Sequence, residues 1–122
     1  MTVLGFHHVL LAMPAGEEEK AVAFYEGVLG IPQLEKPESL RVRGGCWFDN
    51  GSIQIHLGVE EGFRPARKAH PALLVSDLAS IRARLEDFGA ELEYQPALEG
   101  YDRIHAYDPF GNRLELLQPV GD

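Results

Sequence analysis

The stretch Asp108–Leu117 reads DPFGNRLELL and decides how the end of the chain folds. Asp-Pro followed by Gly-Asn is typical of a tight turn, because Pro109 presets its own φ and Gly111 enters conformations that other residues adopt only at a cost. The leucines that follow predict a strand in which Glu115 and its two neighbours face opposite ways. A carboxylate buried between leucines is costly without a partner. Glu115 therefore faces either water on an edge strand, or a polar cavity or a metal.

The composition bounds the class of protein. With 122 residues, 45% of them hydrophobic, we expect one domain with a single core. The net charge of −8, with no basic run longer than Arg67-Lys68, argues against nucleic acid and anionic membranes as partners. The single cysteine, Cys46, excludes an internal disulfide and fits a reducing compartment. Because the N-terminus lacks signal-peptide features and no apolar run is long enough to span a bilayer, we expect a cytoplasmic protein.

Hydrophobic periodicity and turn residues predict the same order of elements in both halves of the chain. In the first half we expect a strand at 6–13, a helix at 17–29, a weak edge strand with a loop at 33–43, and strands at 46–48 and 52–59. A connector at 60–69 separates the halves. In the second half we expect a strand at 70–75, a helix from an N-cap at Ser76 or Asp77 to about Phe88, and strands at 91–95, 103–107 and after the turn at 108–112.

This order is an internal repeat. His70 follows His8 by 62 residues, and Glu115 follows His56 by 59 residues, so the offset is nearly constant. The repeat predicts an α+β fold of two pseudo-symmetric βαβββ modules, at about 1–60 and about 69–122, within a single domain of residues 1–122. Neither module alone can bury its sheet, so we expect the two to pair around a shared surface.

Four residues of metal-ligating type fall at the matched positions of the repeat. They are His8, His56, His70 and Glu115. His56 alternates with apolar residues that pack under a helix, which leaves it on the opposite, concave face, and Glu115 alternates in the same way. Nitrogen and oxygen donors of this kind suit Zn, Ni, Mn, Co or Fe. The sequence therefore predicts a divalent-metal site with three histidines and one glutamate.

Taken together, these motifs resemble the vicinal oxygen chelate superfamily, which includes glyoxalase I, fosfomycin and bleomycin resistance proteins, extradiol dioxygenases and methylmalonyl-CoA epimerases. The resemblance is carried by HHVLLAMP, AVAFYEGVLGIP, IQIHL, HPALLVSDL and DPFGNRLELLQP. It implies a glyoxalase-like, cupped mixed sheet with helices outside and a divalent metal that chelates adjacent oxygens of a small-molecule substrate. It also implies a homodimer, often with each site built from both chains.

The resemblance places the family's ligands residue by residue. The first-strand histidine falls on His8, the histidine of the second module on His70, and the last-strand glutamate on Glu115. The fourth position falls on His56, where the glyoxalase I pattern has a second carboxylate. Glu115 is then the one obvious carboxylate base and the catalytic candidate, beside a metal acting as a Lewis acid.

Candidates for substrate binding come from residue type and placement. Arg67 and Arg103 are candidates for an anionic group, and Trp47 and Tyr107 for an aromatic wall. The alternatives are a solvated connector for Arg67 and core packing for Trp47 and Tyr107. His105 lies in a predicted strand whose facing is undecided, and we interpret it as structural.

Two functions remain open. The first is a small metalloenzyme with lyase, isomerase or dioxygenase chemistry, in which Glu115 is a ligand and proton acceptor. The second is a metal-free protein that binds or sequesters a hydrophobic or antibiotic-like molecule, as the resemblance to ligand-sequestering members of the superfamily implies. A third, a dimeric partner module without a small molecule, is favoured by nothing in the sequence. Metal content separates the first two.

Overall fold

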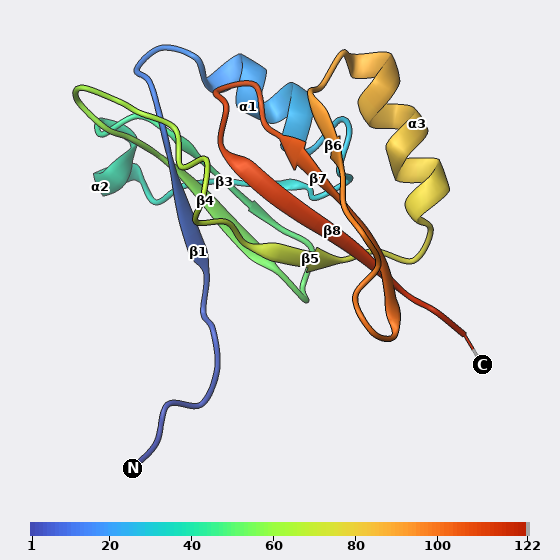
Figure 1. Ribbon diagram of the computed structural model, residues 1–122. Helices are drawn as coiled ribbons and strands as arrows, with labels where there is room; N and C mark the ends of the chain where they lie inside the picture. Colours follow the sequence, from blue (N-terminus) through green and yellow to red (C-terminus); the bar gives the residue numbers. More distant parts are fainter. Residues whose placement is uncertain (122) are drawn as a thin grey trace. The chain divides into compact units, whose positions relative to one another are not determined.

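The computed structural model describes residues 1–121, and its chain forms two compact units that divide after Phe63. Each unit is a four-stranded mixed sheet with helical segments, so the predicted α+β class is confirmed. Figure 1 shows the elements of both units. The units are described one at a time below.

The first unit contains six elements. They are β1 (Val9–Met13), α1 (Glu18–Tyr25), β2 (Gln33–Leu34), α2 (Glu38–Arg41), β3 (Cys46–Asp49) and β4 (Gln54–Val59). The strand order is β1-β4-β3-β2, with β1 parallel to β4 and the other pairs antiparallel. The parallel pair lies side by side in Figure 1, blue against green.

The core of this unit forms where α1 packs on β3. Phe24 and Tyr25 at the end of α1 are fully buried, and the ring centroids of Tyr25 and Phe48 are 5.4 Å apart. On β4, Ile55 and Leu57 are buried on the same side as this helix by strand alternation, so His56 between them faces the other way.

Local geometry changes three predicted boundaries in the first unit. The strand expected at 6–13 begins only at Val9, and the residues before it are exposed. The helix expected at 17–29 ends at Tyr25, because the Gly27 and Leu29 amides bond to carbonyls five residues back and widen the last turn. The region expected as strand and loop at 33–43 holds the extra one-turn helix α2.

The second unit repeats the arrangement. Its elements are β5 (Ala72–Leu74), α3 (Leu78–Phe88), β6 (Leu92–Tyr94), β7 (Tyr101–Tyr107) and β8 (Arg113–Pro119). The strand order is β5-β8-β7-β6, with β5 parallel to β8 and the other pairs antiparallel. The matching order in the two units confirms the two βαβββ modules that the repeat predicts.

Helix α3 begins and ends as its sequence predicts. Asp77 is the N-cap, and its Oδ1 accepts a hydrogen bond from the Ser80 amide at 3.1 Å. Gly89 ends the helix with a φ of 86°, in the left-handed region that favours glycine. Leu78 and Leu85 are the buried residues of this helix.

The turn before β8 is built around a buried carboxylate. Oδ1 of Asp108 accepts hydrogen bonds from the amides of Phe110 and Asn112, both at 2.9 Å. The Asn112 amide side chain donates to Oδ2 of Asp108 at 3.0 Å, and Gly111 has a φ of 94°. The turn sets the register of β7 on β8, which places His105 directly opposite Glu115.

Candidate metal centre

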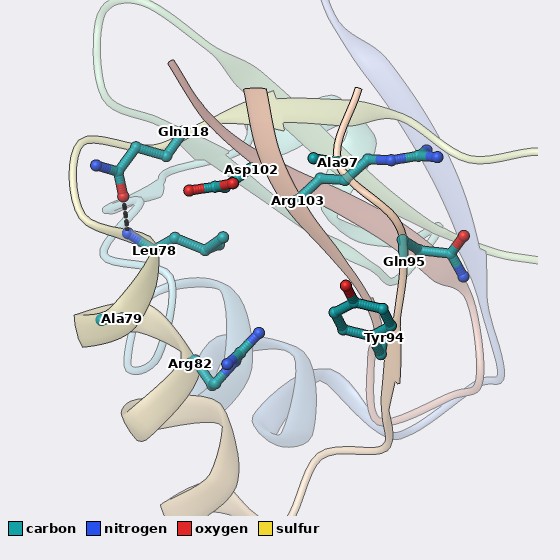
Figure 2. Close-up of a pocket in the computed structure, with 9 residues that line it drawn as sticks. All are labelled: Leu78, Ala79, Arg82, Tyr94, Gln95, Ala97, Asp102, Arg103 and Gln118. Atoms are coloured by element: carbon teal, nitrogen blue, oxygen red, sulfur yellow. Dashed lines mark hydrogen bonds between the residues drawn. The ribbon is translucent and has the colours of Figure 1, made fainter. Parts of the chain in front are cut away.

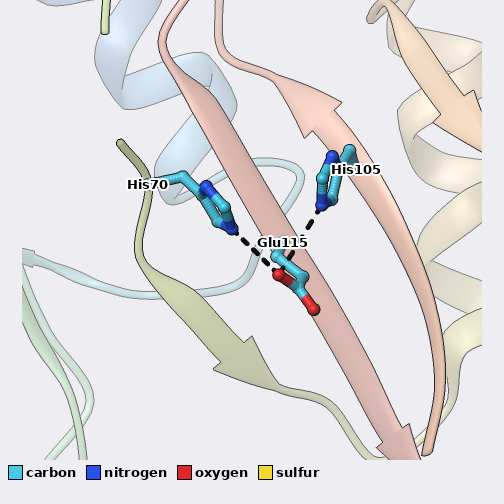
Figure 3. A group of neighbouring side chains, drawn as sticks. All are labelled: His70, His105 and Glu115. Carbon is cyan, nitrogen blue, oxygen red and sulfur yellow. Dashed lines mark hydrogen bonds and ion pairs between the residues drawn. The ribbon is translucent and has the colours of Figure 1, made fainter. Parts of the chain in front are cut away.

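Three side chains of the second unit gather their donor atoms on one face of the sheet. His70 precedes β5, His105 lies on β7 and Glu115 lies on β8 (Figure 3). One ligand atom from each lies within 4.8 Å of the others. This spacing suits two imidazole nitrogens and one carboxylate oxygen around a single divalent ion.

His70 is oriented through its far ring nitrogen. Nδ1 lies 2.8 Å from the Lys68 carbonyl oxygen, which can only accept, so Nδ1 carries the proton. Nε2 lies 2.9 Å from Glu115 Oε1, a contact that is a hydrogen bond when Nε2 carries a proton as well, and a bound metal ion would take the place of that proton. A histidine held through Nδ1–H to a carbonyl has the arrangement that orients metal-binding imidazoles in proteins.

Glu115 is buried and anionic. Besides His70 at Oε1, it has Arg103, whose Nη1 lies 3.2 Å from Oε2. Burial by itself raises the pKa of Glu115, but the hydrogen bonds from His70 and Arg103 outweigh it and hold the pKa below the ordinary value. The carboxylate is thus available as a ligand, with the Arg103 guanidinium already beside it.

His105 is buried with neither ring nitrogen in a hydrogen bond among the residues described. Nε2 lies 3.6 Å from Glu115 Oε1, and Nδ1 lies 3.7 Å from Glu93 Oε1. Burial and the nearby charge of Arg113 lower the pKa of His105, so its ring is neutral and has a free lone pair. A buried polar group without a partner is costly, and a bound ion would satisfy it.

From the sequence we interpret His105 as structural, although the internal repeat contains a signal that this residue lies beside Glu115. In the first unit, Trp47 and His56 are cross-strand partners. In the second unit, His105 on β7 and Glu115 on β8 are cross-strand partners, and these two strands are equivalent to β3 and β4 of the first unit. His105 is therefore the repeat counterpart of Trp47, which the sequence already suggested as a lining residue.

His8 and His56 come together in the first unit. Their rings stack with centroids 3.9 Å apart, and Trp47 stacks on His56 at 4.0 Å. His56 Nε2 also lies 2.9 Å from the side-chain nitrogen of Gln54. Burial, followed by the neighbouring charges of His8, His7 and Lys36, lowers the pKa of His56 to about 4, so this imidazole is neutral at physiological pH.

The four predicted ligands thus form two pairs. His8 and His56 meet in the first unit, and His70 and Glu115 meet in the second.

The predicted substrate-binding residues have different surroundings. Arg103 contacts Glu115, as described, and Trp47 covers His56. Arg67 lies over the Tyr107 ring at 4.1 Å and pairs with Glu91 at 3.2 Å. The Tyr107 hydroxyl accepts hydrogen bonds from Arg113. Tyr107 is buried, so it serves as a support for Arg67 more than as an open wall.

A pocket of about 350 Å³ opens beside α3 (Figure 2). Its lining includes Arg82, Tyr94, Asp102 and Arg103, and the Leu78 amide at its edge donates to Gln118 Oε1 at 2.7 Å. Arg103 therefore belongs both to this pocket and to the surroundings of Glu115.

Comparison with known proteins identifies the family. Residues 5–116 match the family model of the Glyoxalase/Bleomycin resistance protein/Dioxygenase superfamily, and the chain belongs to this superfamily. The chain is 30% identical over 111 residues to Glyoxylase I 4 of Arabidopsis thaliana, an alignment that covers 80% of this chain and 62% of that protein. The chain thus spans about three fifths of the length of this curated relative.

Solved structures agree on the fold. A Bacillus anthracis protein assigned to the glyoxalase family superposes with a TM-score of 0.91 at 41% identity, over 98% of both chains. A variant of the fosfomycin resistance protein FosX from Listeria monocytogenes, in complex with Mn(II) and 1S,2S-dihydroxypropylphosphonic acid, superposes with a TM-score of 0.81. The FosX likeness covers 98% of this chain and 95% of that one at 16% identity, and so it supports the fold alone.

Across residues 1–121, none of the helices combines the length and apolar character that crossing a bilayer requires.

Proposed function

We propose that this chain is a glyoxalase-superfamily metalloprotein that binds one divalent metal and a small-molecule substrate with adjacent oxygens. The observation that carries the proposal is the group formed by the exposed His70 with the buried His105 and Glu115, in which both nitrogens of His105 lack a hydrogen-bond partner among the described residues. Mn(II) in the FosX relative supports a divalent ion on this fold.

The proposed ligands are Glu115 and His70, with His8 and His56 as the donors of the first unit. His105 joins them as a further donor, because its free nitrogen lies within the same group. The proposal includes a homodimer and a cytoplasmic location. The donors of one site then come either from one chain or from both chains of the dimer. Zn, Ni, Mn, Co and Fe all suit such nitrogen and oxygen donors.

The proposed chemistry is that of a lyase, an isomerase or a dioxygenase. A bound divalent ion supplies Lewis acidity toward the chelated substrate oxygens. Glu115 is the carboxylate that holds the ion, and one of its oxygens accepts a proton from the substrate. Arg103, 3.2 Å from that carboxylate, is placed to hold an anionic group of the substrate next to it.

A metal-free function is the second candidate, and a specific observation favours it. Glu115 already has a cation at Oε2 and an imidazole at Oε1, so its charge is compensated without an ion. In this case the chain binds or sequesters a hydrophobic or antibiotic-like molecule.

Elemental analysis of protein purified without an affinity tag tests the proposal. We expect about one divalent ion per chain, lost in Glu115→Gln and reduced in His70→Ala. The control is Glu86→Gln, which removes an exposed carboxylate on α3. Metal-free protein that still binds its ligand after chelator treatment would establish the second candidate instead.

A further inference from the structure

A pocket of about 240 Å³ lies in the first unit, over the cross-strand row that holds His56. Its floor includes Leu10, Trp47 and His56, which are register partners on adjacent strands. The connection between β2 and β3 supplies its other side, through Lys36, Leu40 and Arg43.

The charge of this pocket is opposite to that of the chain. The net charge is −8, yet the lining carries two cations, Lys36 and Arg43, and no carboxylate. Cations gathered in a small pocket raise the local concentration of anions. This lining favours a negatively charged group over a neutral one.

Two carboxylates of this unit have partners other than the lining cations. Glu35 pairs with Arg41, and Glu18 accepts the hydrogen bond of the Gly45 amide at 2.8 Å. The Lys36 ammonium donates to the Gly44 carbonyl oxygen and lies 6.0 Å from the centroid of the Trp47 ring. Arg43 is exposed, and among residues 1–121 its guanidinium has no hydrogen-bond or ion-pair partner.

The rest of the lining is apolar. Leu10 is 57% exposed although it sits in a sheet, and Leu40 and Val59 complete the apolar surface. A pocket of this size is smaller than a drug-sized site, so it takes one end of a small molecule. A ligand with an apolar body and a negatively charged head group would match both the apolar and the cationic parts of the lining.

We propose that this pocket binds a small amphipathic organic acid, with its carboxylate or phosphonate between Lys36 and Arg43 and its apolar part against Leu10 and Leu40. His56, a proposed metal ligand, lies in the same pocket, so the acid is assigned as the substrate class of the proposed metal site. That assignment rests on the proposed function, whereas acid binding itself does not require a metal.

Trp47 makes the proposal measurable, because it is the only tryptophan in the chain and lines the pocket. The full chain is treated with chelator and titrated with hexanoate, hexylphosphonate and 1-hexanol while tryptophan fluorescence is followed. We expect a saturable change with at least one of the two acids, and binding of the alcohol about tenfold weaker, since a charge-assisted hydrogen bond is lost. The tighter of the two acids identifies the head group.

Matched variants locate the binding. Arg43→Gln and Lys36→Gln are each expected to weaken acid binding about tenfold. Lys20→Gln removes the same charge from α1, outside the pocket, and is expected to change affinity little. Circular dichroism checks that each variant folds, and the ligand series on the unaltered chain tests the charge requirement without any variant.

Equal affinity for the acids and the alcohol would overturn the proposal, as would an equal effect of Lys20→Gln and Arg43→Gln. No saturable change with any of the three probes would do the same. Because these titrations contain no metal, they separate the two proposals. Acid binding without metal content leaves the pocket established and the metal centre refuted, and metal content without acid binding gives the reverse.

Discussion

His105 and Glu115 lie directly opposite each other on β7 and β8, with Nε2 of His105 3.6 Å from Oε1 of Glu115. The two groups are too far apart for a hydrogen bond and close enough to share an ion. Glu115 has hydrogen bonds with His70 and Arg103, whereas neither ring nitrogen of His105 has a hydrogen-bond partner among the described residues. A cation bound between the two would therefore give His105 the partner that it lacks.

Replacing His105 by leucine should weaken metal binding without destabilising the metal-free protein. His105→Leu removes two unsatisfied buried nitrogens, so the free energy of unfolding in chelator should stay within about 1 kcal/mol of the unaltered protein or rise. Metal affinity should fall at least about tenfold. Urea denaturation and metal titration measure the two effects. A loss of more than about 2 kcal/mol in chelator would mean that both nitrogens have partners.

Removing the guanidinium beside Glu115 should strengthen metal binding. Arg103 neutralises Oε2 of Glu115, and a second cation there is repelled by it. Arg103→Gln is expected to raise metal affinity about tenfold, measured by competition with a chromophoric chelator. The control Arg84→Gln, on α3, should leave the affinity unchanged. Unchanged metal affinity in Arg103→Gln would show that the ion does not use Glu115.

The free energy of unfolding should decrease as the pH is lowered, because of His56. Its pKa in the folded chain is lowered from 6.5 to about 4, so the unfolded chain binds more protons across this interval. The free energy of unfolding of metal-free protein should therefore decrease as the pH falls from 6.5 to 4, by at most about 3 kcal/mol from this residue. Urea denaturation across this range measures the slope.

The variant His56→Gln should flatten that profile in part. His105, whose pKa is also lowered, contributes in the same direction and keeps a residual slope. An identical profile for His56→Gln and the unaltered protein would contradict the assignment of a neutral, buried His56.

The turn before β8 should be sensitive at its carboxylate. Asp108→Ala removes the acceptor for two backbone amides and one side-chain donor. We therefore expect the free energy of unfolding to fall by about 3 kcal/mol or more. Metal content should fall as well, because the turn sets the register of His105 on Glu115. Glu99→Ala, in an exposed loop position, serves as the control. A change below about 1 kcal/mol would show that backbone bonds alone hold the turn.

The two N-cap candidates of α3 should differ in their effect. Only Asp77 accepts the cap hydrogen bond from the Ser80 amide, so Asp77→Ala is expected to cost about 1 kcal/mol. Ser76→Ala should lower the free energy of unfolding by a few tenths of a kcal/mol at most. Thermal denaturation compares the two, and equal losses would show that the cap is shared.

Features that depend on a few adjacent residues were predictable from the sequence. The start of α3 at Asp77 and its end at Gly89 follow from capping preferences, and the turn at 108–112 follows from its Asp-Pro and Gly-Asn pairs. The two βαβββ modules follow from the repeat, which requires only that similar patterns recur at a constant offset. The extra helix α2 was missed because a single turn leaves no periodicity to detect.

For the candidate site, the sequence by itself determined which residue types stand at the matched positions of the two modules, and it singled out His70 and Glu115. Only the tertiary structure decided their partners. The facing of His105 depends on the register across the turn, and a shift of one residue would move its side chain to the other face of the sheet. The pairing of Arg103 with Glu115, and the stacking of His56 between His8 and Trp47, likewise depend on the register and pairing of the strands. The sequence therefore gives the type of residue at each position, whereas the packing of the sheet sets the partners of each ionisable group.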